Sequence, residues 1–593
     1  MKNKFFLVCS LFVSFVSFIN IFWRGSGIFE IKIANFMLCT SIIVIPYFVR
    51  TCTATVDIKK IIFYFIVFLF SCNFLIVFSM KLTAPKRLPF GLPGNTNWQA
   101  ILAVAFFPII VWGIVEYIPY KLREKKITII LVGFVILMTG WLEYSADSKG
   151  ARLALLICSI IFIVGQYGER VSHLFFQKLL SLSKEKMQDD KFLKVEKNIL
   201  SWNRISDKYI NSVIVLSVFG LGFILVAVAI ISYNYDIKLI SNDIRRFLWS
   251  GSVELLVNSK INYFFGVANG AGEGAFESAF ASFNSLDYYL TNLASDRNNH
   301  PHSQLLYLFL SYGVVVASLL LVLLFKIYSN IFKNFSQKSW FIKAVTISSL
   351  MLLVHGMVDL VLFEWPTNIV FLILIGILAN EVFPFQKTVC TDKHRNGLKS
   401  FVTIFLTVIL LFEICQFSMA TYIGRKGRCR RALNNYQGAD SLFAQSLKKY
   451  PRAQVAFDAM YNAFFNLSNL SLTEKYYGYL RDCGVENYSH NNLFMCVVKL
   501  EENRDELALI YVKREIANFP AEVMPVLLEF YIYNVRLNDN SAALISLKNL
   551  ERNLELKIKD KHKLGETLKI LTSAVRMKNF SPYQLVKNNF RKK

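Results

Sequence analysis

The feature that most constrains this chain is a succession of apolar runs, each long enough to cross a lipid bilayer. A helix needs about 20 mainly apolar residues to span the hydrocarbon layer, and about eleven runs meet this requirement. They cover residues 5–23, 33–49, 61–80, 98–118, 128–144, 152–167, 209–232, 304–325, 344–362, 367–382 and 400–422. Hydrophobic residues make up 54% of the sequence and charged residues only 18%, which excludes an ordinary soluble enzyme and a disordered chain. We therefore expect an all-α polytopic membrane protein with about eleven transmembrane helices.

The distribution of Lys and Arg predicts how these spans are oriented. If the N-terminus is cytoplasmic, the cytoplasmic segments are much richer in basic residues than the segments on the other side, as the positive-inside rule requires. The net charge of +25 then reports topology first and does not indicate nucleic-acid binding. In this orientation a large loop at 233–303 and everything after residue 423 face the outside. In a bacterium the chain would be a multi-pass inner-membrane protein with these parts in the periplasm.

The composition changes after the last predicted span and divides the chain into two domains. Residues 1–423 form the predicted membrane domain, whereas residues 424–593 are polar, basic and patterned like helices. The second domain suggests stacked helix pairs, loosely similar to tetratricopeptide repeats. Cys429, Cys483 and Cys496 would lie in the oxidising compartment. A disulfide between Cys483 and Cys496 and free buried thiols are equally expected there.

Basic side chains and histidines gather at the predicted outer ends of the spans. They are Arg87, Lys149, Arg152, Arg245, His300 and His302, with Asn95 and Asn97 where one span begins. The fourth, sixth and eighth spans start on the outside, so their N-termini, which carry free N–H groups and partial positive charge, also point outward. A phosphate-bearing lipid headgroup fits this rim better than a nucleic acid, because the site is at the membrane surface. Arg suits a bidentate grip on pyrophosphate oxygens.

These residues also have simpler structural interpretations. An Arg near a span end often extends only to lipid headgroups, and a lone His there packs more often than it catalyses. His355 and Asp359 are four residues apart on the ninth predicted span, where a structural hydrogen bond between spans is the expected role. The outer carboxylates are spread out along the sequence, whereas a divalent metal needs two or more close together. We therefore expect no metal and no other cofactor.

Five short motifs follow one another between residues 87 and 366. They are Gly-Asn-Thr-Asn-Trp-Gln-Ala at 94–100, Ser-Lys-Gly-Ala-Arg at 148–152, Arg-Arg-Phe-Leu-Trp at 245–249 with Phe-Gly-Val-Ala-Asn-Gly at 265–270, His-Ser-Gln-Leu-Leu at 302–306, and His-Gly-Met-Val-Asp at 355–359. The glycines at 266 and 270 permit a tight turn close to a ligand, but their spacing is not that of a dinucleotide-binding loop. Together, and in this order, the motifs resemble those of the O-antigen ligase and polymerase superfamily, which includes the pilin-type protein O-oligosaccharyltransferases.

The resemblance implies an activity and a set of roles. A metal-independent glycosyltransferase of this kind moves a glycan as a block from undecaprenyl pyrophosphate to a hydroxyl acceptor in the periplasm. By the same resemblance, His302 takes the proton from the acceptor hydroxyl. Either Lys149 or Arg152 fills the role of the family's Arg, because Lys149 stands at its usual place. The remaining roles implied are pyrophosphate binding by Arg87 and Arg245 and substrate positioning by Asn95, Asn97, Trp249, His300, Gly266 and Gly270.

The acceptor is left open by the motifs. The outer helical domain resembles that of the protein-glycosylating branch, so O-glycosylation of a pilin-like protein is the first expectation. The alternatives are a ligase that joins O-antigen to lipid A–core and a polymerase that joins lipid-linked repeats. A transporter of lipid-linked glycans would show inverted repeats and charges deep in the membrane, and neither is seen in the sequence. A pure scaffold would tolerate the loss of Arg245 and His302. The expected partners are the lipid-linked donor, the acceptor and membrane lipids.

Overall fold

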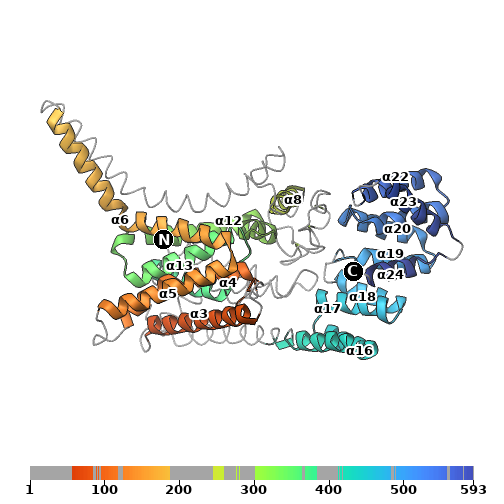
Figure 1. The fold of residues 1–593 in the computed structure, drawn as a ribbon, viewed down its shortest axis with the longest axis horizontal. Helices are drawn as coiled ribbons and strands as arrows, with labels where there is room; N and C mark the ends of the chain where they lie inside the picture. The colour runs from red at the N-terminus through yellow and green to blue at the C-terminus, as the bar shows by residue number, and fades with distance from the viewer. Residues whose placement is uncertain are drawn as a thin grey trace, which may run out of the picture.

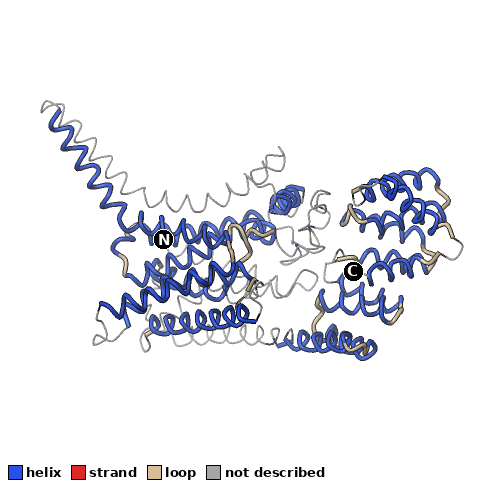
Figure 2. Tube along the Cα trace, in the orientation of Figure 1, coloured by secondary structure: helices blue, strands red, loops and turns tan. Residues whose placement is uncertain are grey.

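The computed structural model is helical throughout the part of the chain that it describes (Figure 2). This part comprises residues 57–83, 88–89, 91, 95–117, 125–186, 245–258, 276, 280, 283, 301–362, 367–383, 412, 415–416, 418–482, 487, 489–556, 558, 561–577 and 580–591. Its buried apolar residues form two separate clusters. One lies among the helices before residue 384 and the other among those after residue 438. The predicted boundary between a membrane domain and a helical domain, at residue 423, lies between the two clusters and stays a prediction.

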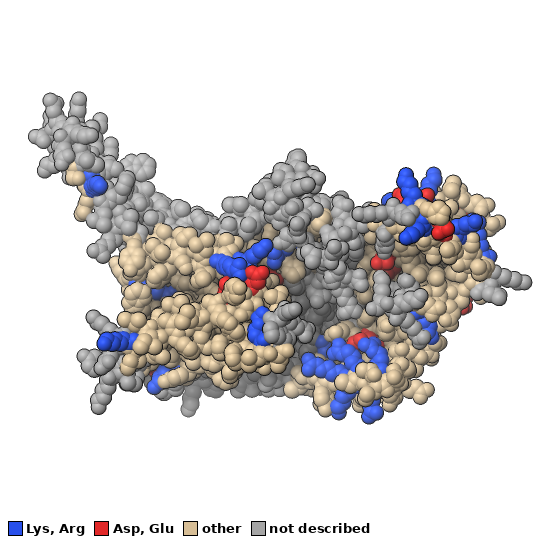
Figure 3. All heavy atoms as spheres, in the orientation of Figure 1, with Lys and Arg blue, Asp and Glu red and all other residues tan. Residues whose placement is uncertain are grey.

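The membrane domain is a bundle of apolar helices (Figure 1). Its elements are α3 (Ile58–Thr83), α4 (Thr96–Tyr117), α5 (Lys125–Ala146), α6 (Lys149–Lys186), α8 (Arg245–Asn258), α12 (Gln304–Phe332), η4 (Phe335–Gln337), α13 (Trp340–Gly356) and α14 (Thr367–Val382). Helix α4 packs against α3, α5, α6 and α13, and its residues from Ala100 to Phe106 are almost completely buried. The face of this domain seen in Figure 3 is mostly uncharged where the chain is described.

Five of these helices are long and apolar enough to cross a membrane. They are Ile58–Thr83, Thr96–Tyr117, Lys126–Ala146, Lys149–Tyr167 and Gln304–Phe332, and α13 and α14 are shorter apolar helices. Large apolar side chains such as Phe68 and Leu137 point away from the bundle and are 63% and 73% exposed. Lipid would cover them, because a water-exposed apolar surface of this size is costly. The helical membrane class is therefore supported.

The predicted count of about eleven spans stays a prediction. The runs at 5–23, 33–49 and 209–232 and most of 400–422 lie outside the described residues. The predicted run at 344–362 extends beyond the end of the helix found there. Helix α13 ends at Gly356, so Asp359 lies in the turn that follows the helix and not on its face.

The second domain is a stack of short helices, and all but the last pack one against the next along the chain (Figure 1). They are α16 (Tyr436–Lys449), α17 (Ala453–Tyr461), η5 (Asn462–Asn466), α18 (Leu470–Asp482), α19 (Asn491–Glu501), α20 (Asp505–Asn518), α21 (Val523–Tyr531), η6 (Ile532–Arg536), α22 (Asn540–Glu555), α23 (Lys561–Val575) and α24 (Pro582–Arg591). Helix α24 returns to pack on α19. Cys496 is a free buried thiol and Cys429 a free exposed one, and Cys483 lies outside the described residues.

Candidate active site

The Asp359 carboxylate lies where several helix ends of the membrane domain meet. It follows α13 in a turn in which the backbone N–H groups of Val358 and Asp359 donate to the carbonyl of His355 at 3.0 and 3.1 Å. Its side chain is only 3% exposed. A carboxylate this deeply buried requires hydrogen-bond donors, and one comes from the backbone N–H of Leu360, 2.8 Å from Oδ1.

His302 supplies a second contact to this carboxylate. Its Nδ1 lies 3.3 Å from Asp359 Oδ1, and its side chain is 37% exposed. The residue has a φ of +48°, a left-handed conformation that is uncommon for side chains other than Gly and Asn. Ser303 follows as the N-cap of α12, with its Oγ accepting from the N–H of Leu306 at 3.4 Å. The turn and the cap together direct the imidazole toward Asp359 while one side of it stays accessible.

The start of α4 reaches the same carboxylate. Asn97 Nδ2 donates to Asp359 Oδ2 at 3.3 Å. Asn95 caps the helix, because its Oδ1 accepts from the N–H of Asn97 at 2.8 Å. Both predicted positioning residues that begin this span therefore lie at the site, and one of them contacts Asp359 directly.

The first turn of α6 lies beside His355. A Cβ added to Gly150 would be 2.8 Å from His355 Cε1, so only glycine lets the imidazole lie this close to the helix backbone. Ser148 caps this helix, since its Oγ accepts from the N–H of Ala151 at 3.3 Å. Lys149 is exposed at the same helix start, and no ion pair joins it to another described residue.

Arg152, the other candidate on α6, is held by carboxylates. Its Nε lies 2.7 Å from Glu143 Oε1, and its Nη2 lies 2.8 Å from Asp147 Oδ1. The side chain is 47% exposed. To bind a phosphate, this guanidinium would have to give up two partners on its own helix hairpin, whereas Lys149 would give up none among the described residues.

Helix α8 brings the third motif to the site. Arg245 at its start is close enough to His355 for their charges to interact. Trp249, one turn later, is 3% exposed and belongs to the core of the membrane domain. The helix packs against α12, so the buried indole fixes α8 while Arg245 lies near the site. Trp249 thus has a clear packing role.

Four predicted site residues, Arg87, His300, Gly266 and Gly270, lie outside the described residues. Gly91, a described residue before α4, has a φ of +60°. A Cβ on Gly91 would be 2.4 Å from Asn73 Oδ1 and 2.5 Å from Gln99 Cβ. Among the described residues, no group of three His, Cys, Asp or Glu side chains could hold a metal ion.

The arrangement can perform one kind of chemistry well. With the proton on His302 Nδ1, Asp359 would accept that N–H, and Nε2 would be the nitrogen able to act as a base. The N-termini of α4, α6 and α12 meet around this pair, and helix N-termini favour a nearby anion. A histidine base beside an anion site suits the transfer of a group from a phosphate leaving group to a nucleophile that must lose a proton.

Sequence reasoning underrated Asp359 and missed Gly150. Hydropathy extended the ninth span across Asp359, which made a hydrogen bond between spans its expected role. The available signal was the fifth motif, which holds both His355 and Asp359. Comparisons of the chain with protein-family models, with curated proteins and with solved structures found no match.

Proposed function

We propose that this chain transfers a glycan from undecaprenyl pyrophosphate to a hydroxyl acceptor on the outer side of the inner membrane. The observation that carries the proposal is the contact of His302 with the buried Asp359 carboxylate where α4, α6 and α12 begin. All five resembling motifs contribute described residues to this one place. Their sequence order did not require them to meet, so their meeting supports a shared role.

In the proposed reaction His302 acts as the general base. Its Nε2 takes the proton of the acceptor hydroxyl while the hydroxyl oxygen forms a bond to C1 of the first sugar. The bond from C1 to the pyrophosphate oxygen breaks, and the pyrophosphate leaves with both electrons. Asp359 positions the ring and stabilises the imidazolium that forms. Direct attack inverts the configuration at C1.

The leaving pyrophosphate needs positive charge around it. We assign this role to Arg245, to Lys149 and to the three helix N-termini, with Arg87 as a further candidate on the loop before α4. Lys149 is preferred to Arg152 because Arg152 is already paired with Glu143 and Asp147. Removing one such charge-stabilising contact typically costs about 100-fold or more in rate.

We further propose that the acceptor is a protein. The support is the helical domain at 424–593, since stacked helix pairs commonly present a surface for another polypeptide. In this proposal the domain lies in the periplasm, where a pilin-like acceptor would reach both it and the site. The tetratricopeptide-like character of the domain is part of the same proposal.

The test is glycan detection in strains that lack the gene and carry wild type, His302→Ala or His562→Ala in its place. His562 is a matched control, because its side chain is 83% exposed on α23 of the helical domain. We expect one protein band to carry glycan with wild type and His562→Ala but not with His302→Ala, and an unchanged lipopolysaccharide ladder. A ladder reduced to bare core would identify a ligase instead. Unchanged glycans in the deletion strain would refute glycan transfer.

A further inference from the structure

The helix at residues 418–432 connects the last predicted span to the helical domain, and one face of it changes character along its length. Phe412, Met419 and Tyr422 follow at helical spacing and are 59%, 52% and 59% exposed. Lys426 and Arg430 continue the same face and are also exposed. Lys426 Nζ lies 4.5 Å from the centroid of the Tyr422 ring. An exposed apolar stripe that ends in an aromatic ring and a cation is typical of the membrane–water boundary.

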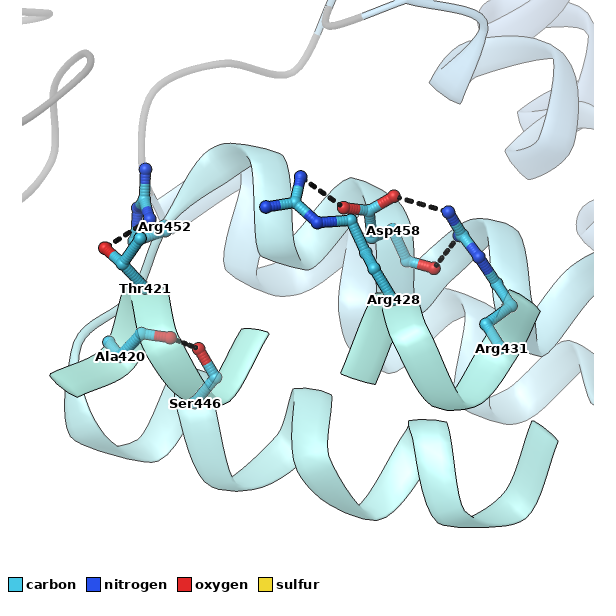
Figure 4. A network of polar contacts seen from close by, with 7 residues as sticks. All are labelled: Ala420, Thr421, Arg428, Arg431, Ser446, Arg452 and Asp458. Atoms are coloured by element: carbon cyan, nitrogen blue, oxygen red, sulfur yellow. Dashed lines mark hydrogen bonds and ion pairs between the residues drawn. The ribbon is translucent and has the colours of Figure 1, made fainter. Parts of the chain in front are cut away.

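Helix α16 runs back along this helix toward the predicted span (Figure 4). Ser446 Oγ, near the end of α16, donates to the carbonyl of Ala420 at 2.7 Å. Arg452, just after α16, donates from Nη1 to Thr421 Oγ1 at 2.6 Å. The C-terminal end of α16 therefore lies beside the point at which the chain leaves the predicted span.

This packing gathers basic residues from two segments around one point. We call Arg425, Lys426, Lys448, Lys449 and Arg452 the basic collar. The first four are exposed, and none of these four pairs with a carboxylate in the described part of the chain. Figure 3 shows Lys and Arg side chains gathered over this end of the helical domain. Like charges on adjoining segments repel one another, so a nearby anionic surface would stabilise them.

Two other arginines of the same helix, unlike the exposed collar residues, are paired with a carboxylate. Arg428 Nη1 lies 3.5 Å and Arg431 Nη2 lies 3.0 Å from the carboxylate of Asp458, on α17 (Figure 4). Arg431 Nη1 also donates to the Asp458 carbonyl at 3.2 Å. These two side chains fasten the helix to the domain. The four exposed collar residues take no part in these contacts with Asp458.

We propose that the basic collar binds the anionic headgroups of phospholipids in the leaflet where the chain leaves its last predicted span. Phosphate matches the unpaired cations in charge, and the change from apolar to basic residues at Tyr422 puts the collar at headgroup level. Each Lys or Arg near an anionic leaflet strengthens attachment by about fivefold at low salt. The contact would hold the helical domain against the membrane. This inference does not depend on glycan transfer.

The test measures how close the collar comes to lipid headgroups in the full chain. A fluorophore is attached to Cys429, which is exposed on the collar's own helix, with the other cysteines replaced. The chain is reconstituted in nanodiscs of phosphatidylcholine with increasing phosphatidylglycerol and a fixed trace of a headgroup-quencher lipid. We expect quenching to rise with phosphatidylglycerol and to return to its starting level when salt is added.

Two double substitutions test whether the collar residues are responsible for the quenching. Lys448→Gln with Lys449→Gln should raise the phosphatidylglycerol content needed for half of the added quenching by about fivefold or more. Lys561→Gln with Lys569→Gln removes two exposed charges from α23 and should behave as wild type. Equal quenching with and without phosphatidylglycerol in the wild-type chain overturns the proposal, and so does an unchanged response in the collar variant. The salt series needs no substitution beyond the cysteine replacements, so a misfolded collar variant cannot hide the answer.

Discussion

Asp359 accepts hydrogen bonds from three parts of the chain with a side chain that is 3% exposed. Only the backbone N–H of Leu360 belongs to its own turn, and His302 and Asn97 come from other helices. A buried carboxylate needs hydrogen-bond donors, and one of the groups in contact with Asp359 is the imidazole of His302, which is 37% exposed. Because Asp359 holds the partly exposed ring of His302, we assign Asp359 a positioning role.

Replacing Asp359 with Asn tests this role at the residue scale. An amide keeps the size of the side chain but removes the charge that fixes the proton on His302 Nδ1. We expect the initial rate of glycan transfer to fall by about 100-fold while the protein level is unchanged. Asp147→Asn is the control, because Asp147 is exposed at the same end of the bundle and Asn tolerates its φ of +51°. Equal rates for both variants would remove Asp359 from the mechanism.

Gly150 gives a second prediction at this scale. A methyl group there would be 2.8 Å from His355 Cε1 and 3.3 Å from Val358 Cγ2, so Gly150→Ala must displace the ring or the helix. Overpacking of this kind typically costs about 1–3 kcal/mol. We expect a lower unfolding midpoint in detergent and slower transfer. Gly140→Ala on α5 meets no atom within 4 Å and should leave both unchanged. A harmless Gly150→Ala would mean that the close contact does not constrain the site.

At the scale of elements, the starts of α6 and α12 are built alike. Each has a residue at positive φ, Asp147 or His302, followed by a serine cap, Ser148 or Ser303. The sequence predicts where such helices begin, because a cap precedes an apolar run. It does not predict which helix starts meet, since that depends on packing between segments far apart in the chain. The predicted position of Asp359 within a span was wrong, because hydropathy alone does not show that α13 ends at Gly356.

The helical domain contains a structural repeat that is difficult to recognise in the sequence. Asn434, Ser468, Asn503 and Asn538 all have positive φ and lie about 35 residues apart. Each stands two residues before a helix, at α16, α18, α20 and α22. Asn is favoured in this conformation, but the Ser at 468 breaks the pattern. Helix pairs could therefore be predicted from apolar spacing, while their regular period could not.

Asp539, the cap of α22, makes stability depend on pH. Its carboxylate accepts from the N–H groups of Ser541 and Ala542 at 3.1 and 3.0 Å. The bond from Ala542, aided by the Ser541 side chain, holds the pKa of Asp539 below its ordinary value. A carboxyl whose pKa is lowered by folding stabilises the fold above its unfolded pKa, and the effect is lost as pH falls through the folded pKa.

Thermal unfolding of the helical domain within the full chain checks this. Asp539→Ala should lower the unfolding midpoint at neutral pH, and its difference from wild type should shrink in acid, below pH of about 4. Asp539→Asn should keep a cap whose contribution changes little with pH. A difference between wild type and Asp539→Ala that is the same at both pH values would contradict the assignment.

For the whole molecule, the helical class could be predicted from composition and apolar run length alone, and the division into two domains stays a prediction. The orientation is a prediction that Cys429 can test, because it is exposed in the helical domain. In a variant that keeps only this cysteine, a membrane-impermeant maleimide should label intact cells from which the outer membrane has been removed. A matched variant that keeps only Cys496, which is fully buried, should react only after unfolding. Labelling of Cys429 only after cell lysis would place the helical domain in the cytoplasm.

The most direct test of glycan transfer uses the purified chain in lipid vesicles. A donor with a radiolabelled glycan on undecaprenyl pyrophosphate is mixed with a periplasmic protein extract, and label that leaves the lipid for protein is measured over time. We predict transfer by the wild-type chain and a loss of about 100-fold or more with His302→Ala. A donor that stays intact with the wild-type chain, or equal transfer by both chains, would contradict the account.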